Sequence, residues 1–592
     1  MMMKPRLLPA CALLAGLLAS CAPQRPQEAD LVVLYTTDVH GACLPFDFKK
    51  NAPMRTSLAN VSTYVNQVRA EQPDAVLLFD TGDYLQGQPS LYYYNYIDTT
   101  SDHIVCRVYN KMGYDAIGLG NHDVEVGAEM YESRLQRMLQ MPLLCANAID
   151  TRTGQTMFQP YAVMERQGIR IAVLGMITPN IHAWLPKSLW PNLEFQDMVE
   201  CAQQWIPIIR EKEQPDLIVG LFHAGSDPNS GTSDMDTYMH ENGSVPVAVK
   251  VPGFDLVLVG HDHTLSQQTV VNVAGDSVAV LDANTQASYV GRADIHLTLG
   301  SDGKYRKEVR TELVPMKEMP VDSTFYADFQ SAIDTVNHYV DTPIGTLTAP
   351  LAGIDALYGP SEFMDFIHEA QLWATGADIS MASVLSPYDV IPAGPLTWRQ
   401  LFSLYKYENR LFTLDMTGEE VIKYLEFGFD NQFSTMTSAA DHLLHFALGE
   451  DGEIQRNNFG PRLVTPTFNY TSAAGIRHTV DVSKPAGQRV TVIEMSDGQP
   501  FDPQKHYKVA INSYQASGGG NFFPVGLGWD YDYLKGRTLT ESDKDVRRYI
   551  AEYITLIQTV TPRSRGDWQV VPQAWWAAGR ARDMKIMDPR QR

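Results

Sequence analysis

Five short apolar segments in the first 263 residues each lead into side chains of the kinds that bind metal ions. The segments are rich in Leu, Val and Ile and have the length of buried β-strands. In an α/β sheet the carboxyl ends of parallel strands share one edge, so side chains that follow the strands can converge on one site. The segments and the motifs that follow them are Leu31–Tyr35 before Asp38-Val39-His40, Ala75–Phe79 before Gly82-Asp83, Ala116–Leu119 before Gly120-Asn121-His122-Asp123, Leu217–Phe222 before His223-Ala224-Gly225, and Leu256–Val259 before Gly260-His261-Asp262-His263.

Each motif by itself is explained as well by a polar turn, because the chain holds 15 His and 69 acidic residues. Five such coincidences at strand ends favour a metal site instead. Asn121 offers an amide oxygen as a ligand, and His122 beside it can stabilise charge or transfer a proton. Asp83 lies in a glycine-rich turn that lets the backbone come close, so it is the candidate to bridge two cations. Carboxylates mixed with imidazoles suit two divalent metal ions, as in phosphoryl transfer, without choosing among Mn, Co, Zn, Ni and Fe.

Composition and absent motifs exclude several other classes of protein. The formal net charge of −22 over 592 residues argues against a binder of nucleic-acid polymers, which need a basic surface. A small anionic substrate is still compatible, because metal ions supply positive charge locally. No GxxxxGK(S/T), GxSxG or HExxH motif is present, so P-loop, serine-hydrolase and zincin interpretations fail. The four cysteines beyond the targeting segment show no CxxC spacing; we expect them to be buried, with a disulfide left open.

The first 21 residues resemble a bacterial lipoprotein signal peptide. Lys4 and Arg6 precede the apolar run Leu7–Leu18, which is too short to span a bilayer, and residues 18–21 resemble a lipobox that ends at Cys21. The resemblance implies cleavage before Cys21, lipid attachment to its sulfur, and a lipid-anchored protein of a bacterial cell envelope, periplasmic or surface-exposed. An ordinary secretory signal is the alternative.

The alternation of strand-like and helical patterns predicts an α/β chain with two domains. Helices are expected at Leu58, Val61, Val65 and Val68, which have helical spacing, and over residues 128–139 and 198–210. Three prolines near residues 315–343 bracket a helical segment that we interpret as the connection between domains. The predicted divisions are a lipoprotein signal peptide (1–21), a first domain (29–314), an interdomain linker (315–343), a second domain (344–559) and a C-terminal extension (560–592) whose role the sequence does not indicate.

The five motifs match, in order, those of calcineurin-like metallophosphoesterases, and with the second domain the chain resembles the bacterial 5′-nucleotidase superfamily. This resemblance implies a four-layer β-sandwich flanked by helices, plus a C-terminal α/β substrate domain of the 5′-nucleotidase type joined by a helical linker. It implies that His122 stabilises or protonates at the phosphate, and that Glu125 orients His122 where 5′-nucleotidases usually have Asp. It also implies two ligand sets that share Asp83: Asp38, His40, Asp83 and His263 for one metal ion, and Asp83, Asn121, His223 and His261 for the other.

The second domain decides the substrate in this superfamily. Members that act on 5′-nucleotides carry a Gly-rich stretch followed by an Arg, but residues 382–387 hold no Arg and the next one is Arg399. The segments 401–412, 468–476, 479–490 and 512–522 instead resemble periplasmic 2′,3′-cyclic-nucleotide 2′-phosphodiesterase/3′-nucleotidases. In that subfamily two aromatic side chains sandwich the base, and by motif these are Tyr407 and Tyr514. Burial of both tyrosines in the core is the alternative.

The expected function is therefore hydrolysis of nucleotide phosphoesters with two divalent metal ions. A 2′,3′-cyclic nucleotide would be opened to a 3′-nucleotide, from which phosphate and nucleoside are then released. The expected partners are a nucleotide substrate and, through the lipid anchor only, a membrane. Because one domain would hold the base and the other the phosphate, a hinge near residues 315–345 is expected to gate turnover. The alternatives are a 5′-nucleotidase or broader nucleotide phosphohydrolase, and a lipid-anchored, non-catalytic binding protein on the same scaffold; a protein phosphatase would leave the second domain unexplained.

Overall fold

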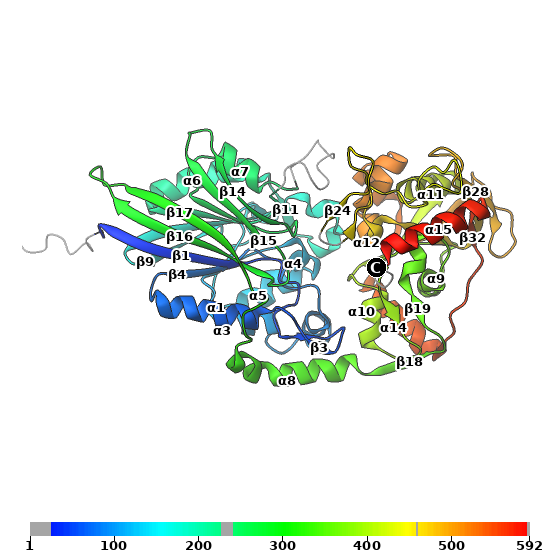
Figure 1. Cartoon of the computed structure of the whole chain (residues 1–592), viewed down its shortest axis with the longest axis horizontal. Coiled ribbons are helices and arrows are strands. Elements are labelled where there is room, and N and C mark those ends of the chain that lie inside the picture. The colour runs from blue at the N-terminus through cyan, green and yellow to red at the C-terminus, as the bar shows by residue number, and fades with distance from the viewer. Residues whose placement is uncertain (1–24, 227–240, 458–459, 589–592) are drawn as a thin grey trace, which may run out of the picture.

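The computed structural model describes residues 25–226, 241–457 and 460–588 (Figure 1). Within these residues the chain forms two units joined by helix α8 (Ser323–Val340), which confirms the helix expected in the proline-bracketed segment. Cys21 and the rest of the predicted signal peptide lie outside the described residues. Among the described helices, none is both long enough and apolar enough to cross a membrane.

Two six-stranded sheets that pack face to face form the centre of the first unit. Apolar side chains from both sheets, among them Val33, Phe79, Val219 and Leu258, fill the space between them. Strands buried on both faces are expected to be almost continuously apolar, as the five segments are. One sheet has the order β17 (Tyr305–Pro315), β16 (Tyr289–Leu299), β1 (Glu28–Thr36), β4 (Val76–Asp80), β5 (Ala116–Gly118), β6 (Leu143–Leu144), and the other β14 (Leu265–Val271), β15 (Ser277–Ala283), β13 (Leu256–Val259), β12 (Leu217–His223), β10 (Ile169–Ile177), β9 (Tyr161–Arg166).

Helices cover the outer faces of both sheets, which confirms the four-layer β-sandwich. Figure 1 shows α1 (Leu58–Glu71) and α3 (Ile104–Met112) along one side, and α6 (Met198–Glu213) and α7 (Ser244–Lys250) along the other. Helix α1 buries the apolar positions whose spacing predicts it. The helix predicted over residues 128–139 is present as a continuous helical stretch over residues 128–138. Its middle, η2 (Met130–Arg134), is π-helical, and α5 (Leu135–Met138) follows.

The five strands that precede the ligand-type motifs belong to both sheets. Strand β1 pairs in parallel with β4, and β4 with β5, in the first sheet. Strands β12 and β13 pair in parallel in the second sheet. Since the two sheets pack face to face, the carboxyl ends of all five strands meet at one edge of the sandwich, beside the second unit.

The second unit is a mixed α/β domain. Its five-stranded sheet has the order β26 (Thr471–Ala474), β20 (Ile379–Ser383), β29 (His506–Asn512), β23 (Arg410–Thr417), β30 (Thr538–Asp545). Its main helices are α9 (Glu362–Thr375), α10 (Trp398–Leu404), α11 (Gly418–Gln432) and α14 (Val546–Ile557). A capping box between Thr417 and Glu420 starts α11 directly at the end of β23, which fixes the direction of the chain as it leaves the sheet.

Residues beyond 559, interpreted from the sequence as an extension, pack within the second unit. Strand β32 (Trp568–Val571) pairs in parallel with β27 (Ile476–Asp481), and α15 (Gln573–Met587) follows it. The buried Asp583 carboxylate on α15 accepts hydrogen bonds from the backbone N–H groups of Leu443 and Leu444, at 2.8 and 2.9 Å. The sequence does not indicate this role, because the partners of β32 and Asp583 lie about 90 and 140 residues earlier.

The two units pack against each other through α8. One apolar cluster runs from the helices of the first unit through Phe325, Phe329 and Val336 of α8 into the second unit. The guanidinium of Arg399 donates hydrogen bonds to Asp341 at the end of α8 and to the carbonyl oxygen of Phe48 in the first unit. All four cysteines in the described residues are buried and free, as expected for small apolar side chains: Cys43, Cys106, Cys145 and Cys201.

Candidate active site

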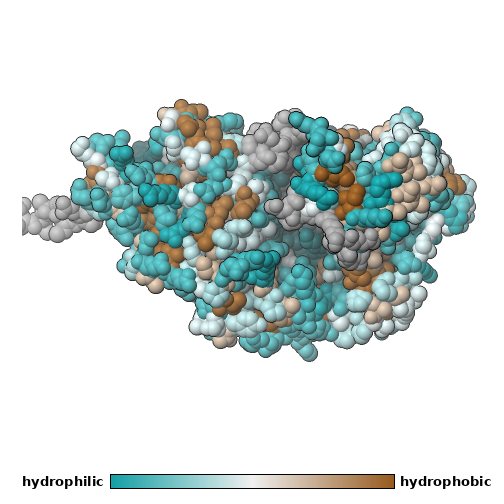
Figure 2. Space-filling model, in the orientation of Figure 1, coloured by the Kyte–Doolittle hydropathy of each residue, from teal (hydrophilic) through white to brown (hydrophobic). Residues whose placement is uncertain are grey.

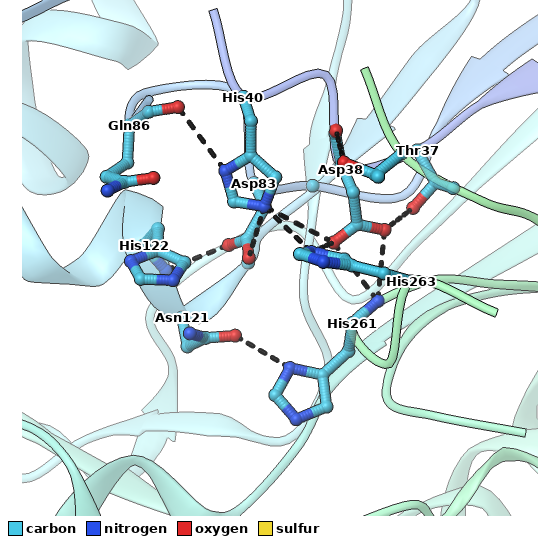
Figure 3. A network of polar contacts seen from close by, with 12 residues as sticks. Thr37, Asp38, His40, Asp83, Gln86, Asn121, His122, His261 and His263 are labelled. Atoms are coloured by element: carbon cyan, nitrogen blue, oxygen red, sulfur yellow. Dashed lines mark hydrogen bonds and ion pairs between the residues drawn. The ribbon is translucent and has the colours of Figure 1, made fainter. Parts of the chain in front are cut away.

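Two carboxylates and three imidazoles converge where β1, β4, β12 and β13 end (Figure 3). The Asp83 Oδ2 atom lies 3.2 Å from the Nε2 atom of His223 and 3.8 Å from that of His40. The Asp38 Oδ1 atom lies 3.4 Å from Nε2 of His263, and 3.9 and 4.0 Å from the Nε2 atoms of His40 and His223. Two groups of three possible ligands, each within 4.8 Å of one another, result: Asp38, His40 and His263, and Asp38, Asp83 and His223.

Asn121 and His261 extend this arrangement on one side. The Asn121 Oδ1 atom lies 3.2 Å from Nε2 of His223 and 2.9 Å from Nδ1 of His261. Figure 3 shows Asn121 and His261 together, below the carboxylates of Asp38 and Asp83. All seven residues that the sequence nominates as metal ligands therefore lie together. Two carboxylates, one amide oxygen and four imidazoles form a donor set that suits divalent cations.

Burial and neighbouring charges shift the pKa values of these groups. It lowers the pKa of His40 to about 3, so this imidazole is neutral and has a lone pair for a metal ion. Burial alone would raise the pKa of Asp83, but the nearby imidazoles of His223 and His122 outweigh it and hold that pKa well below its usual value. The carboxylate is therefore ionised throughout the physiological range, which a metal ligand requires.

The backbone is held in an unusual conformation at most of the candidate ligands. Five of the seven have a positive φ, in the left-handed region that costs L-residues about 1 kcal/mol or more each. A side chain at Gly120 would collide with the carboxylate of Asp83. Only the precise course of these turns brings the ligand atoms together. The five residues and their φ angles are Asp38 (47°), His40 (43°), Asp83 (61°), His261 (91°) and His263 (54°).

Asp123, the last residue of the motif Gly120-Asn121-His122-Asp123, anchors two of these turns to each other. Its buried carboxylate accepts hydrogen bonds from the backbone N–H groups of Gly120 and Asp83, both at 2.8 Å, and of Tyr84 and Leu85, both at 3.0 Å. Asp123 thus accepts hydrogen bonds from both loops and fixes the loop after β4 to the loop after β5.

His122 and Glu125 form a hydrogen-bonded pair on the short helix α4 (Asn121–Glu125). The spacing of three residues places both side chains on one face of the helix, with 2.5 Å between Nδ1 of His122 and Oε2 of Glu125. Burial alone would lower the pKa of His122, but the carboxylates of Asp83 and Glu125 outweigh it and raise this pKa to about 10. The pair can hold a proton beside the candidate ligands, and the longer arm of Glu, relative to Asp, still reaches the imidazole.

A cleft of about 820 Å³ opens in front of these residues and is lined by both units. The first unit contributes His122, Glu125 and His261, and the second contributes Tyr407 and Tyr514. Both tyrosines are partly buried, so neither is a core residue as the alternative interpretation held. Figure 2 shows the surface hollowed between the two units.

Several cleft residues are not among those nominated from the sequence. Phe468 and Asn469 lie in one of the segments that carry the subfamily resemblance, so that resemblance is a signal that could have found them. Trp184, Glu241 and Arg462 lie in no motif. Arg399, the next Arg after the stretch 382–387, contacts the linker helix and is not among the residues that line the cleft.

Comparisons with known proteins agree with this arrangement. Residues 31–265 match the family model for calcineurin-like phosphoesterases, and residues 343–525 match the model for the 5′-nucleotidase C-terminal domain. Among similar proteins is the 2′,3′-cyclic-nucleotide 2′-phosphodiesterase/3′-nucleotidase of Yersinia enterocolitica, 24% identical, with 94% of this chain and 91% of that protein aligned. Another is the 5′-nucleotidase of Vibrio vulnificus, 27% identical over 80% of this chain and 92% of that protein.

A longer relative and a solved structure extend the comparison. The trifunctional nucleotide phosphoesterase protein YfkN of Bacillus subtilis is 26% identical over 93% of this chain, which spans only 39% of YfkN. The fold is also that of a putative 5′-nucleotidase from Staphylococcus aureus, with a TM-score of 0.73 and 22% identity over 92% of this chain and all of that one. At 22% identity, this similarity is evidence for the fold only.

Proposed function

The chain belongs to the calcineurin-like phosphoesterases that carry a 5′-nucleotidase C-terminal domain, and from this premise we propose that it hydrolyses nucleotide phosphoesters. The reaction opens a 2′,3′-cyclic nucleotide to the 3′-nucleotide and then releases phosphate and nucleoside. Relatives named for this activity align over about nine-tenths of both chains, which supports the proposal.

The observation that carries the proposal is a cleft with metal-ligand side chains on one wall and Tyr407 and Tyr514 on the other. A nucleotide has a phosphate that needs cations and a base that stacks on aromatic rings. Of the described residues that line the cleft, Arg462 is the one Lys or Arg, and it is exposed. The metal ions would therefore neutralise the negative charge of the phosphate. Enzymes selective for 5′-nucleotides would instead be expected to bind the substrate with several arginines.

Divalent metals are the cofactors of calcineurin-like phosphoesterases, and we propose two ions here, whose identity the donor set does not choose. Asp38, His40, Asp83 and His263 would hold one ion, and Asp83, Asn121, His223 and His261 would hold the other. When bound, the ions neutralise phosphate oxygens and lower the pKa of a water that serves as nucleophile. Asp83 lies 3.2 Å from His223 and 3.8 Å from His40, one imidazole of each set, as a shared ligand requires. Asp38 also lies within 4.0 Å of imidazoles of both sets, and its assignment to one ion follows from the family resemblance.

The side chains of the protein then position the substrate and move a proton. Tyr407 and Tyr514 hold the base in the second unit, so that the phosphate lies in front of His122. His122 Nε2 faces the developing charge on the leaving ribose oxygen, while Nδ1 is held by Glu125. Because Glu125 fixes the ring, the proton stays available at the cleft side of the imidazole.

The test is phosphate release from purified protein with Mn²⁺, comparing 2′,3′-cyclic AMP, 3′-AMP and 5′-AMP. We expect turnover of the first two substrates and little of the third. His122→Ala should abolish most of the activity, and His296→Ala, at an exposed histidine far from the cleft, serves as the matched control. Preference for 5′-AMP would contradict the substrate assignment and leave the metal site standing.

A 5′-nucleotidase is the second candidate, and its support is the relative of that name in Vibrio vulnificus. The same three-substrate assay separates the two activities. A non-catalytic binding protein would bind nucleotide without turnover, and it would not require the metal ligands; metal analysis of the purified protein together with the assay distinguishes it.

We further propose that the protein is a lipoprotein of a bacterial cell envelope, anchored through Cys21. The support is the lipobox-like sequence at residues 18–21. Cys21→Ala should move the protein from the membrane fraction to the soluble envelope fraction. A protein that stays in the membrane fraction after this change would contradict the anchor.

A further inference from the structure

One candidate metal ligand, His261, is held from three sides. Its Nδ1 atom lies 2.9 Å from Oδ1 of Asn121, and its Nε2 atom lies 3.0 Å from Oε1 of Glu241. The Trp184 ring packs against the imidazole with 5.2 Å between ring centroids and 35° between planes. His261 and Glu241 are 10% and 13% exposed, so water weakens their contact little.

The two ring nitrogens of His261 have different surroundings, which decides their roles. Nδ1 faces Asn121 Oδ1, which also lies 3.2 Å from Nε2 of His223, so three candidate ligands of one ion meet there. An imidazole that binds a metal ion through one nitrogen carries its proton on the other and donates it to a fixed acceptor. Nε2 of His261 is therefore the protonated nitrogen, and the carboxylate of Glu241 accepts its hydrogen bond.

The other candidate imidazoles are oriented differently. The Nδ1 atom of His40 lies 3.3 Å from the backbone carbonyl oxygen of Gln86. The Nδ1 atom of His223 has no hydrogen-bond partner within the described ranges. Glu241 places a carboxylate on the distal nitrogen of His261. It adds a negative charge beside a proposed ligand set that includes one carboxylate, Asp83.

Glu241 reaches this position through the connection between β12 and β13. His223 ends β12, Glu241 lies shortly before α7, and His261 follows β13. Glu241 thus lies between two candidate ligands in the sequence, and its carboxylate contacts the second of them, His261. No motif of the sequence marks Glu241, because its partner is 20 residues away and the spacing has no helical or strand period.

We propose that Glu241 is a positioning residue for the second metal ion: it holds His261 with Nδ1 directed at that ion and strengthens its binding. The inference rests on the proposed function, since it concerns the metal ions that this function requires. Carboxylates that accept a hydrogen bond from a metal-binding imidazole are typically worth 10- to 100-fold in metal affinity. Glu241 does not contact the reacting atoms in this assignment, so its effect passes through His261.

The experiment is titration of Mn²⁺ into the metal-stripped protein, followed by calorimetry, for the wild type and three variants. Glu241→Ala should weaken one of two Mn²⁺ sites by about 10- to 100-fold and leave the other within about twofold. Glu241→Gln keeps the shape of the side chain and an acceptor oxygen but loses the charge, and its effect should be intermediate. Glu211→Ala, at an exposed Glu on α6, is the matched control and should bind as the wild type does.

Activity gives a second readout. Saturating Mn²⁺ should restore the kcat of Glu241→Ala to within about threefold of the wild type, whereas a direct role in the chemistry would leave kcat low. Unchanged affinity at both sites in Glu241→Ala, or a wild-type protein that binds no Mn²⁺, would overturn the proposal. A wild type that binds two ions but hydrolyses no nucleotide would refute the proposed function and leave the role of Glu241 supported by the binding data.

Discussion

Removal of the Glu125 charge should lower the pKa of His122 and with it the alkaline limit of activity. The 2.5 Å contact joins Nδ1 of His122, which is 25% exposed, to a carboxylate that is 9% exposed. Two unit charges about 4 Å apart interact by about 4 kcal/mol at an effective dielectric constant of about 20, which equals about 3 pKa units. Allowing for the exposed part of the imidazole, we expect Glu125→Gln to lower the pKa of His122 by about 2 units.

Metal ions bound at Asp83 would cancel the effect of that carboxylate on His122, which leaves Glu125 as the main negative neighbour in the loaded enzyme. If His122 acts as a protonated group, activity is lost as pH rises through its pKa. The alkaline limb of the kcat profile should therefore move to lower pH by about 2 units in Glu125→Gln. Below this limb, kcat should also fall, by about 10- to 1000-fold, because the imidazole loses its orientation.

The assay is the pH dependence of kcat for 3′-AMP with saturating Mn²⁺, from about pH 6 to about pH 11, so that the range includes a wild-type limb near the pKa of His122. Glu125→Asp is the control, since it keeps the charge with a shorter arm; its kcat should fall while its alkaline limb stays within about half a unit of the wild type. If the limbs of Glu125→Gln and the wild type coincide, Glu125 does not set the protonation of His122 and the electrostatic argument is wrong.

Three further predictions concern the metal site, the base site and the interface between the units. Asp83→Asn should reduce the bound Mn²⁺ from two ions to one or none, with kcat at least about 1000-fold lower, and two ions retained by metal analysis would contradict a shared ligand. Tyr514→Ala should raise KM about 5- to 160-fold at unchanged kcat, from the roughly 1 to 3 kcal/mol of a stacked base, while Tyr514→Phe stays near the wild type; equal KM values would contradict stacking. Burial, together with the nearby charge of Lys406, lowers the pKa of the partly buried Lys49 to about 8. Protonation of Lys49 therefore destabilises the folded protein. The stability that the protein has above the pKa of an unfolded Lys is lost as the pH falls through about 8. Lys49→Met should therefore raise the unfolding free energy at pH 7 by about 1 to 2 kcal/mol, with the gain disappearing toward pH 10.5, and a gain independent of pH in thermal unfolding would refute this.

The nature of the site follows from short-range order in the sequence. Strands buried between two sheets must be apolar and must end in polar turns, so the ligand-type residues after β1, β4, β5, β12 and β13 are visible as motifs. The pairing of His122 with Glu125 is implied by the family resemblance, and the structure realises it on the short helix α4, where three residues make about one turn. The helical spacing of apolar residues that predicts α1 is likewise visible within a short stretch of the sequence.

Contacts between distant segments were decided only by the tertiary structure. The packing of separate elements decides which of the two sheets each motif-bearing strand joins and how β32 pairs with β27. It also decides that Asp38 approaches His223 as well as His263. The same holds for Glu241 and Trp184, which come to His261 on loops without a period or motif. Local spacing carries no information on such contacts, because closing long loops is determined by the packing of the whole chain and not by the residues at the two ends.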